Sequence, residues 1–245
     1  MNAPDFPRAL CAIFLAASAA ISANALAQGS HSTHSAPPLQ QDAAAYALLE
    51  SGLRLASSGH SDEALAGFDK VIALYEDSFK DEKDKLYSAR SKTEMLGYLL
   101  QAVNAGESAK VVSASWARAY YLKGYVLQDL HRIAEAKAAL LRAVELAPEN
   151  SQYLGELGSI YQIERNWPRA LDVFQSAASA SDYSPPKLKN AELARAWRGM
   201  GYVLVELGQL DEAEKWYQKC LALDNNDARA LAELRYVQER RAKQE

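Results

Sequence analysis

Thirty-four residues, from Ala117 to Asn150, set the architecture of this chain: they read ARAYYLKGYVLQDLHRIAEAKAALLRAVELAPEN. A second stretch of the same length follows without a gap, from Ser151 to Ser184, and reads SQYLGELGSIYQIERNWPRALDVFQSAASASDYS. A third, from Ala194 to Asp227, reads ARAWRGMGYVLVELGQLDEAEKWYQKCLALDNND. Self-similarity at a fixed spacing indicates a repeat protein, in which each copy is one supersecondary unit.

The three copies share small and large side chains at fixed places. Glycine stands at the eighth place and alanine at the twentieth, which are Gly124, Gly158, Gly201, Ala136, Ala170 and Ala213. Large side chains fill the fourth, eleventh and twenty-fourth places, which are Tyr120, Leu154, Trp197, Leu127, Tyr161, Leu204, Leu140, Phe174 and Tyr217. Two antiparallel helices pack closely only where small residues let their axes approach, so each copy predicts one helical hairpin that must stack on its neighbours.

Residues 45–78 form a fourth copy, with Gly52, Ala64 and Phe68 at the eighth, twentieth and twenty-fourth places. Residues 83–116 would abut the next copy, but Arg90 stands at the eighth place and Gly106 at the twenty-fourth. We therefore expect a degenerate hairpin here, with helices over 81–90 and 93–104 and a short segment over 107–112. From residue 44 onward the pattern is helical and predicts no strand.

The helix boundaries follow from proline and capping residues. Pro168 fits the first turn of a second helix, and Asp211 is a plausible cap of another. Between the last two copies, the insertion 185–193 begins with two prolines that favour extended backbone, and Asn190 can cap the next helix. A final helix over 228–243 should cover the apolar end of the stack with Leu231, Leu234 and Val237.

The pattern resembles the tetratricopeptide-repeat family. The resemblance implies an all-α, right-handed superhelical α-solenoid of antiparallel helix hairpins with a C-terminal capping helix. The units would be 45–78, a degenerate 83–116, 117–150, 151–184 and 194–227 within a domain over 42–245. In this family the first helix of each hairpin lines a concave groove, so the resemblance implies a partner-binding groove that includes Arg118, Tyr121, Tyr125, Gln128, Gln152, Ser159, Arg195, Arg198 and Tyr202. Tyr46 and Leu49 occupy the matching places of the first copy, and Gly155 with Ser159 would leave room for a ligand chain.

The first residues predict an export signal. Arg8 precedes a short apolar run, and Ala25-Leu26-Ala27 is a small-residue cleavage site, so residues 1–27 read as a signal peptide cut after Ala27. We expect a periplasmic or secreted protein, with no membrane span after cleavage. Residues 28–41 read as a flexible leader. Its His31 and His34 make only half of a metal site, so we expect no metal.

Composition and motifs argue against other classes of function. The 245 residues carry 27 basic and 31 acidic side chains, a net charge of −4, which does not favour nucleic acid as a partner. We find no nucleophile elbow, phosphate loop, zinc-protease motif or redox cysteine pair, so we expect neither an enzyme nor a cofactor. Cys220 stands at a small-residue packing place, and His60 and His131 fall in inter-helix turns.

The resulting hypothesis is a non-catalytic scaffold or adaptor of the cell envelope that binds a protein or peptide in its groove. Two alternatives stay open. One is a self-associating structural scaffold that forms a homo-oligomer through its repeat ends or convex face, and the other is a small-molecule or glycan-binding module. The groove tyrosines could equally pack against neighbouring helices, since aromatic side chains dominate both cores and interfaces.

Overall fold

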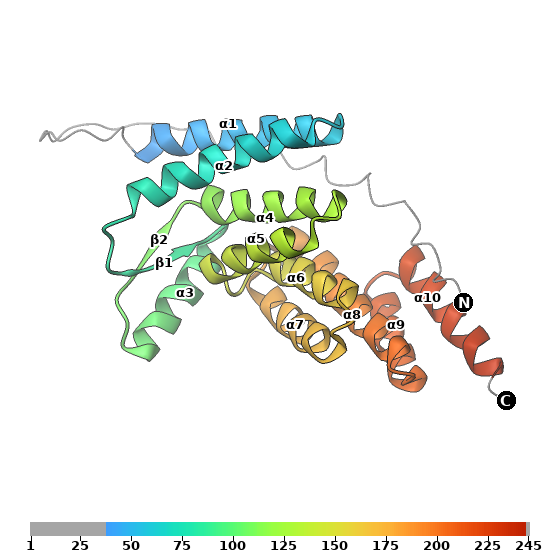
Figure 1. Cartoon of the computed structure of the whole chain (residues 1–245). Coiled ribbons are helices and arrows are strands. Elements are labelled where there is room, and N and C mark those ends of the chain that lie inside the picture. Colours follow the sequence, from blue (N-terminus) through green and yellow to red (C-terminus); the bar gives the residue numbers. More distant parts are fainter. Residues whose placement is uncertain (1–37, 244–245) are drawn as a thin grey trace, which may run out of the picture.

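The computed structural model describes residues 38–243 (Figure 1). The expected signal peptide, and the leader up to residue 37 with His31 and His34, lie outside the described residues. In chain order the described elements are α1 (Pro38–Ser57), α2 (Ser61–Ser78), β1 (Lys85–Ser88), α3 (Lys92–Ala105), β2 (Ala109–Val112), α4 (Ala114–Asp129), α5 (Ile133–Leu146), α6 (Ser151–Ile163), α7 (Trp167–Ala180), the 3-10 turn η1 (Ser181–Tyr183), α8 (Pro186–Glu206), α9 (Leu210–Leu223) and α10 (Ala228–Ala242).

Four helical hairpins build the solenoid, and each contains the predicted close contact. A Cβ added to Gly124 would lie 2.7 Å from the side chain of Leu140, and one added to Gly158 would lie 2.8 Å from the ring of Phe174. The same contact joins Gly52 to Phe68 and Gly201 to Tyr217. The eighth place is therefore a point of close approach, as predicted, and the structure adds that the side chain facing it comes from the twenty-fourth place, where only glycine admits it so close to the helix axis.

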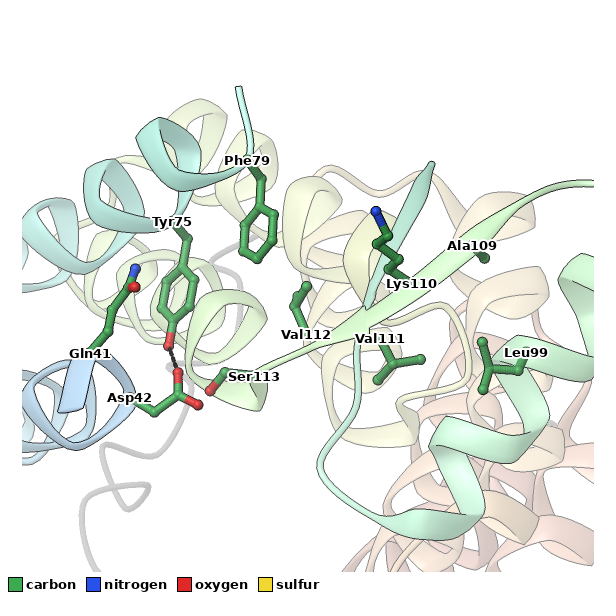
Figure 2. A pocket seen from close by; sticks show the side chains of 10 residues that line it. All are labelled: Gln41, Asp42, Tyr75, Phe79, Leu99, Ala109, Lys110, Val111, Val112 and Ser113. Carbon is green, nitrogen blue, oxygen red and sulfur yellow. Dashed lines mark hydrogen bonds between the residues drawn. The ribbon is translucent and has the colours of Figure 1, made fainter. Parts of the chain in front are cut away.

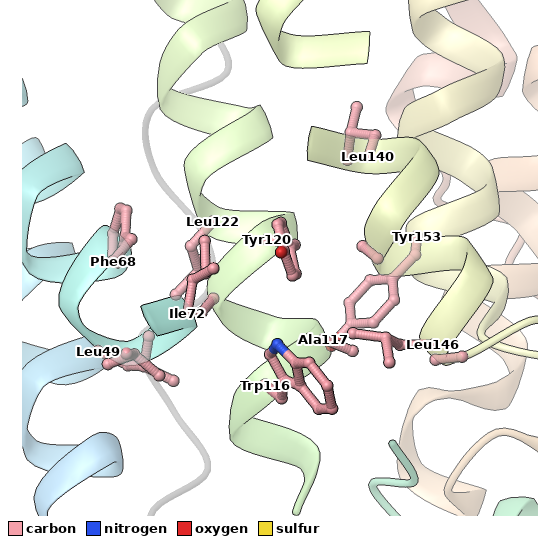
Figure 3. Close-up of a cluster of buried hydrophobic side chains, with 14 of the residues drawn as sticks. Leu49, Phe68, Ile72, Trp116, Ala117, Tyr120, Leu122, Leu140, Leu146 and Tyr153 are labelled. Carbon is pink, nitrogen blue, oxygen red and sulfur yellow. The ribbon is translucent and has the colours of Figure 1, made fainter. Parts of the chain in front are cut away.

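The hairpins bury one continuous core from α1 to α6 (Figure 3). Trp116, at the start of α4, stacks between Tyr75 of α2 and Phe79, the first residue after α2, with ring centroids 5.8 and 5.7 Å away. Smaller clusters continue the core through α7, α8, α9 and α10. Cys220 is fully buried in the last hairpin, which confirms the prediction of a packing thiol.

The chain between α2 and α4 is not a degenerate hairpin: the helix expected over 93–104 is present as α3, but the helix expected over 81–90 is absent and the hairpin prediction was wrong. Lys85–Ser88 is strand β1 rather than part of a helix over 81–90, and Ala109–Val112 is strand β2. The two strands are parallel, with Lys85 opposite Ala109 and Ser88 opposite Val112, and α3 is the crossover between them. Ser91 caps the start of α3, and Gly106, with φ of 68°, ends it in a left-handed conformation.

A buried ionic cluster ties this insert, residues 79–113, to the start of α8. The guanidinium of Arg90 donates to Glu94 at 2.6 Å and to both carboxylate oxygens of Glu192 at 2.7 and 2.8 Å. Ser184 also donates to Glu192 at 2.5 Å. Arg90 would interrupt a regular repeat at the eighth place, and here it is the residue that joins the two irregular parts of the chain.

Three predicted helix starts need correction. α1 begins at Pro38, so the end of the expected leader is helical. α8 begins at Pro186, and Asn190 lies inside it rather than capping it, because Pro185 has extended backbone and Pro186 is tolerated in a first turn. α9 begins at Leu210, which places Asp211 in the first turn rather than at the cap. Pro168 lies in the first turn of α7 as predicted.

α10 covers the end of the stack. Val237 is fully buried against the last hairpin, with Leu234 packed beside it, whereas Leu231 is 39% exposed. Asp227 caps the helix by accepting the backbone N–H groups of Arg229 and Ala230. Arg240 donates to the carbonyl of Val205 at 3.0 Å, near the end of α8, where this carbonyl also accepts the backbone N–H of Gly208.

Candidate partner-binding face

The candidate residues lie on the first helices of three successive hairpins, α4, α6 and α8. We call the surface that they form the inner face. It comprises Arg118, Tyr121, Tyr125, Gln128, Gln152, Ser159, Arg195, Arg198 and Tyr202. All nine residues are half-buried, so none of them is a core residue and none stands free in solvent. Side chains of this kind have both a fixed position and a surface that a partner can reach.

Tyr121 is held from two sides. Its ring stacks on Tyr153 with centroids 4.8 Å apart, and its hydroxyl accepts a hydrogen bond from Nε2 of Gln152 at 2.9 Å. Burial, with a further contribution from the charge of Glu156, raises the pKa of the Tyr121 hydroxyl well above its usual value. The phenol therefore stays neutral, and it links α4 to α6 while one part of the side chain remains accessible.

Each of the three arginines forms an ion pair with a neighbouring element. Arg118 of α4 pairs with Glu50 of α1 at 2.8 Å, and Arg195 of α8 pairs with Glu156 of α6 at 2.7 Å. Arg198 pairs with Asp227, the cap of α10. These pairs connect successive repeats along the inner face. They also mean that a carboxylate on a partner would have to replace one that already belongs to the chain.

The middle of the inner face has less room than expected. The space beside Gly155 is taken by Arg195, whose Nε lies 3.5 Å from the position of an added Cβ. Ser159 donates to the carbonyl of Gly155 at 3.1 Å. The expected gap for a ligand chain is therefore filled by the side chain of the next repeat, and Leu49, expected on this face, is fully buried.

Glu156 is the residue of this face that sequence reasoning missed. It is only 4% exposed, and its carboxylate holds Arg195. The signal was present, because the sixth place has Glu156 in one copy but Leu122 and Gly199 in the other two. A buried carboxylate needs a cationic partner, so the copy with a glutamate at this place must receive an arginine from an adjacent helix.

Aromatic and polar groups extend the inner face at both ends. Tyr46 of α1 is 50% exposed, and the guanidinium of Arg118 lies 5.5 Å from its ring centroid. At the other end, Tyr202 contacts Trp167 with centroids 6.4 Å apart.

Gln128 has a buried Oε1 without a hydrogen-bond partner among the described residues. Beside it, burial and the charge of Glu156 raise the pKa of Asp129.

A separate hollow lies away from the inner face, between α1, α2, α3 and β2 (Figure 2). Phe79, Leu99 and Val111 give it apolar walls, and Asp42 accepts a hydrogen bond from the hydroxyl of Tyr75 at 2.5 Å at one end. None of the inner-face residues lines it. It contains no histidine or cysteine that would suggest a metal or a nucleophile.

Two further observations concern ligands and membranes. Within residues 38–243, no three histidine, cysteine or acidic side chains come together as metal ligands would. In the same part of the chain, no helix combines the length and the apolar character that a membrane crossing requires. His60 and His131 lie in the turns after α1 and α4, as predicted.

Comparisons with known proteins agree on the family. A model described as tetratricopeptide repeat matches residues 121–185, and another with the same description matches residues 194–227. No curated protein matches the chain.

Solved structures share the fold at low sequence identity. The chain is similar to pilF of Pseudomonas aeruginosa, with 15% identity and a TM-score of 0.58 over 83% of this chain and 72% of that one. It is also similar to MamA, residues 41 to the end, from Desulfovibrio magneticus RS-1, with 16% identity and a TM-score of 0.53 over 81% and 85%. The family-model matches therefore identify tetratricopeptide repeats over residues 121–185 and 194–227 of this chain, and the solved structures share its fold.

Proposed function

We propose that this chain is a non-catalytic adaptor of the cell envelope that binds an extended segment of a protein partner along the inner face. The observation that carries the proposal is the set of half-buried tyrosines and arginines on α4 and α8, with Gln152 and Ser159 of α6 between them. Tyrosine and arginine bury a large area and keep a polar group for orientation, which makes them frequent centres of binding energy. The setting in the envelope rests on the export signal expected over residues 1–27.

The ion pairs on the inner face suggest how a partner is held. Arg118 and Glu50 each keep about a third of their side-chain surface exposed, so their pair can open with little cost. An acidic group of the partner can then bind Arg118 while its neighbouring apolar part packs on Tyr46. Arg195 is less available, because its removal from Glu156 would leave a buried carboxylate without a partner.

The first experiment is photo-crosslinking in the native envelope, with a photoreactive residue in place of Tyr125. The matched control has the same residue in place of Leu141, which is exposed on a second helix, α5. We expect one discrete adduct with another protein from position 125 and none from position 141. Equal adducts from both positions, or none from position 125, would contradict the proposal.

The second step measures affinity for the crosslinked segment as a synthetic peptide. We expect Arg118→Ala to weaken binding about fivefold to tenfold, which is the range of a moderate interface contact. Lys215→Ala, which changes an exposed side chain of α9, should leave the affinity unchanged. Far-ultraviolet circular dichroism of both variants must match the unaltered protein, so that lost binding reports contact rather than unfolding. Unchanged affinity in Arg118→Ala, and also in Tyr121→Ala and Arg198→Ala, would remove the inner face as the binding site.

A further inference from the structure

The solvent face of α3 is apolar. Leu96, Leu100 and Val103 are 63%, 62% and 71% exposed, and they are the most exposed of the large apolar side chains in the described part of the chain. The next is Tyr46 at 50%. Because their spacing is four and three residues, the three lie on one side of the helix. We call this row the α3 stripe.

The opposite side of α3 is buried and contains a charge. Glu94 and Tyr98 are fully buried, and Ala102 is 2% exposed. A helix at a protein surface normally has the reverse arrangement, with its apolar side in the core and its charges outside. Single exposed leucines are common, but a continuous apolar row on a helix marks a contact surface.

Nothing in the described part of the chain covers the α3 stripe. The elements that pack on α3 are β1, β2 and η1, on its buried side. α3 lies at the margin of the molecule, and its C-terminal end points away from the hairpins (Figure 1). Beside it, Leu99 and Val111 line the hollow of Figure 2 and extend the apolar surface toward β2.

We propose that the α3 stripe is a homodimer contact, in which α3 of one copy packs antiparallel against α3 of a second copy. The row is close to self-complementary about Leu100. In a two-fold arrangement Leu96 of one copy faces Val103 of the other, and the two Leu100 side chains meet at the axis.

The charges at the two ends of α3 favour the antiparallel arrangement. Lys92 is exposed at the start of the helix, and Glu107 is exposed just after its end, about equally far from Leu100. Antiparallel packing therefore sets Lys92 of each copy near Glu107 of the other, and it also aligns the helix dipoles favourably. Glu107 now pairs with Lys85 at 3.0 Å in an exposed pair that can be shared. A parallel arrangement would set like charges together.

The size of the contact predicts its strength. Three side chains on one helix form a small patch, below the total of about 1,200 Å² at which stable specific interfaces begin, and small interfaces are typical of weak, reversible complexes. We therefore expect association that depends on protein concentration. The inner face is on other helices, so the dimer leaves it free.

The test is the mass of the purified full-length protein over a range of concentrations, measured by analytical ultracentrifugation. We expect the average mass to rise from that of one chain toward that of two. Leu100→Asp should weaken the association at least tenfold, because it sets two carboxylates at the two-fold axis. The matched control, Leu141→Asp, replaces another exposed leucine and should associate like the unaltered protein. A mass of one chain at every concentration, or unchanged association of Leu100→Asp, would overturn the proposal.

A charge exchange tests the antiparallel geometry. Lys92→Glu and Glu107→Lys should each weaken association about threefold to tenfold, since each change affects two symmetric surface contacts. The double variant should recover the original affinity, because the opposite charges meet again. Failure of the double variant to recover would exclude this geometry. Leu100→Cys should form a disulfide between two copies under mild oxidation, and an adduct with another protein in place of a second copy would overturn the proposal.

Discussion

The repeats and the insert, residues 79–113, differ in the residue at the eighth place of the 34-residue pattern, which is glycine in the repeats and arginine in the insert. In the hairpin of α6 and α7, the place for a small residue has Gly158, and the ring of Phe174 fills the space beside it. In the insert, the matching place has Arg90, whose guanidinium is neutralised by Glu94 and Glu192. At this place the repeats therefore form an apolar contact, whereas the insert forms an ionic one, and α3 buries Glu94 while it exposes Leu96 and Leu100. The contrast indicates that the insert is shaped by contacts other than repeat stacking.

The largest effect should come from the repeat core. Phe174 packs against Gly158 of its own hairpin and Gly199 of the next, and it is 2% exposed. We expect Phe174→Ala to lower the free energy of unfolding by about 3–5 kcal/mol, because the loss of the ring would leave a cavity between two hairpins. Urea denaturation measures this loss. The control is Gln175→Ala, which changes the neighbouring exposed residue. A stability loss below about 1 kcal/mol for Phe174→Ala would contradict a core shared by the two hairpins.

The buried cluster of the insert should show a large effect that depends on pH. Arg90→Met leaves Glu94 and Glu192 buried beside each other, which should lower stability by about 3 kcal/mol at pH 7. Burial already raises the pKa of Glu94, and the loss of Arg90 would raise it further. A carboxyl group whose pKa is higher in the folded than in the unfolded state stabilises the folded state at pH values below the unfolded-state pKa. This stabilisation is lost as the pH rises through the folded-state pKa.

The deficit of Arg90→Met should therefore shrink as the pH falls from 7 toward the ordinary carboxyl range near 4.5. Thermal unfolding at a series of pH values measures it against the unaltered protein. The triple variant Arg90→Met, Glu94→Leu, Glu192→Leu should regain most of the lost stability at pH 7, because no buried charge remains. A deficit of Arg90→Met that does not change with pH would show that lost packing, rather than charge, causes it.

The smallest expected effect is the difference in stability loss between alanine variants of two glycines, Gly201 and Gly97, that face tyrosine rings. An added Cβ would lie 2.7 Å from Cε1 of Tyr217 at Gly201, and 2.7 Å from Cε1 of Tyr183 at Gly97. Tyr217 is fully buried and cannot move aside, so we expect Gly201→Ala to lower stability by about 1–3 kcal/mol. Tyr183 is half-buried and can rotate outward, so Gly97→Ala should lower it by less than about 1 kcal/mol. Chemical denaturation of both variants measures the difference, and equal losses would show that the insert is packed as rigidly as the repeats.

The sequence by itself determined the repeated part of the fold. Glycine and alanine at fixed places are local requirements of two helices in close contact, so their spacing predicted the hairpins, their core and the covering of the stack by α10. The resemblance to the tetratricopeptide-repeat family implied which helices form the inner face. The sequence also placed Cys220 in the core and Pro168 in the first turn of α7.

Only the tertiary structure decided the parts that depend on distant partners. Strand β1 exists because β2 lies beside it, and no local pattern in four residues distinguishes such a strand from a helix turn. The pairing of Arg90 with Glu192 joins residues 102 positions apart, and Glu156 holds Arg195 from another repeat. A repeat spacing reports the contacts that recur in each copy. Contacts that occur once leave no period in the sequence, so the strands of the insert, its apolar outer face and the partners of the inner-face arginines became visible only in the folded chain.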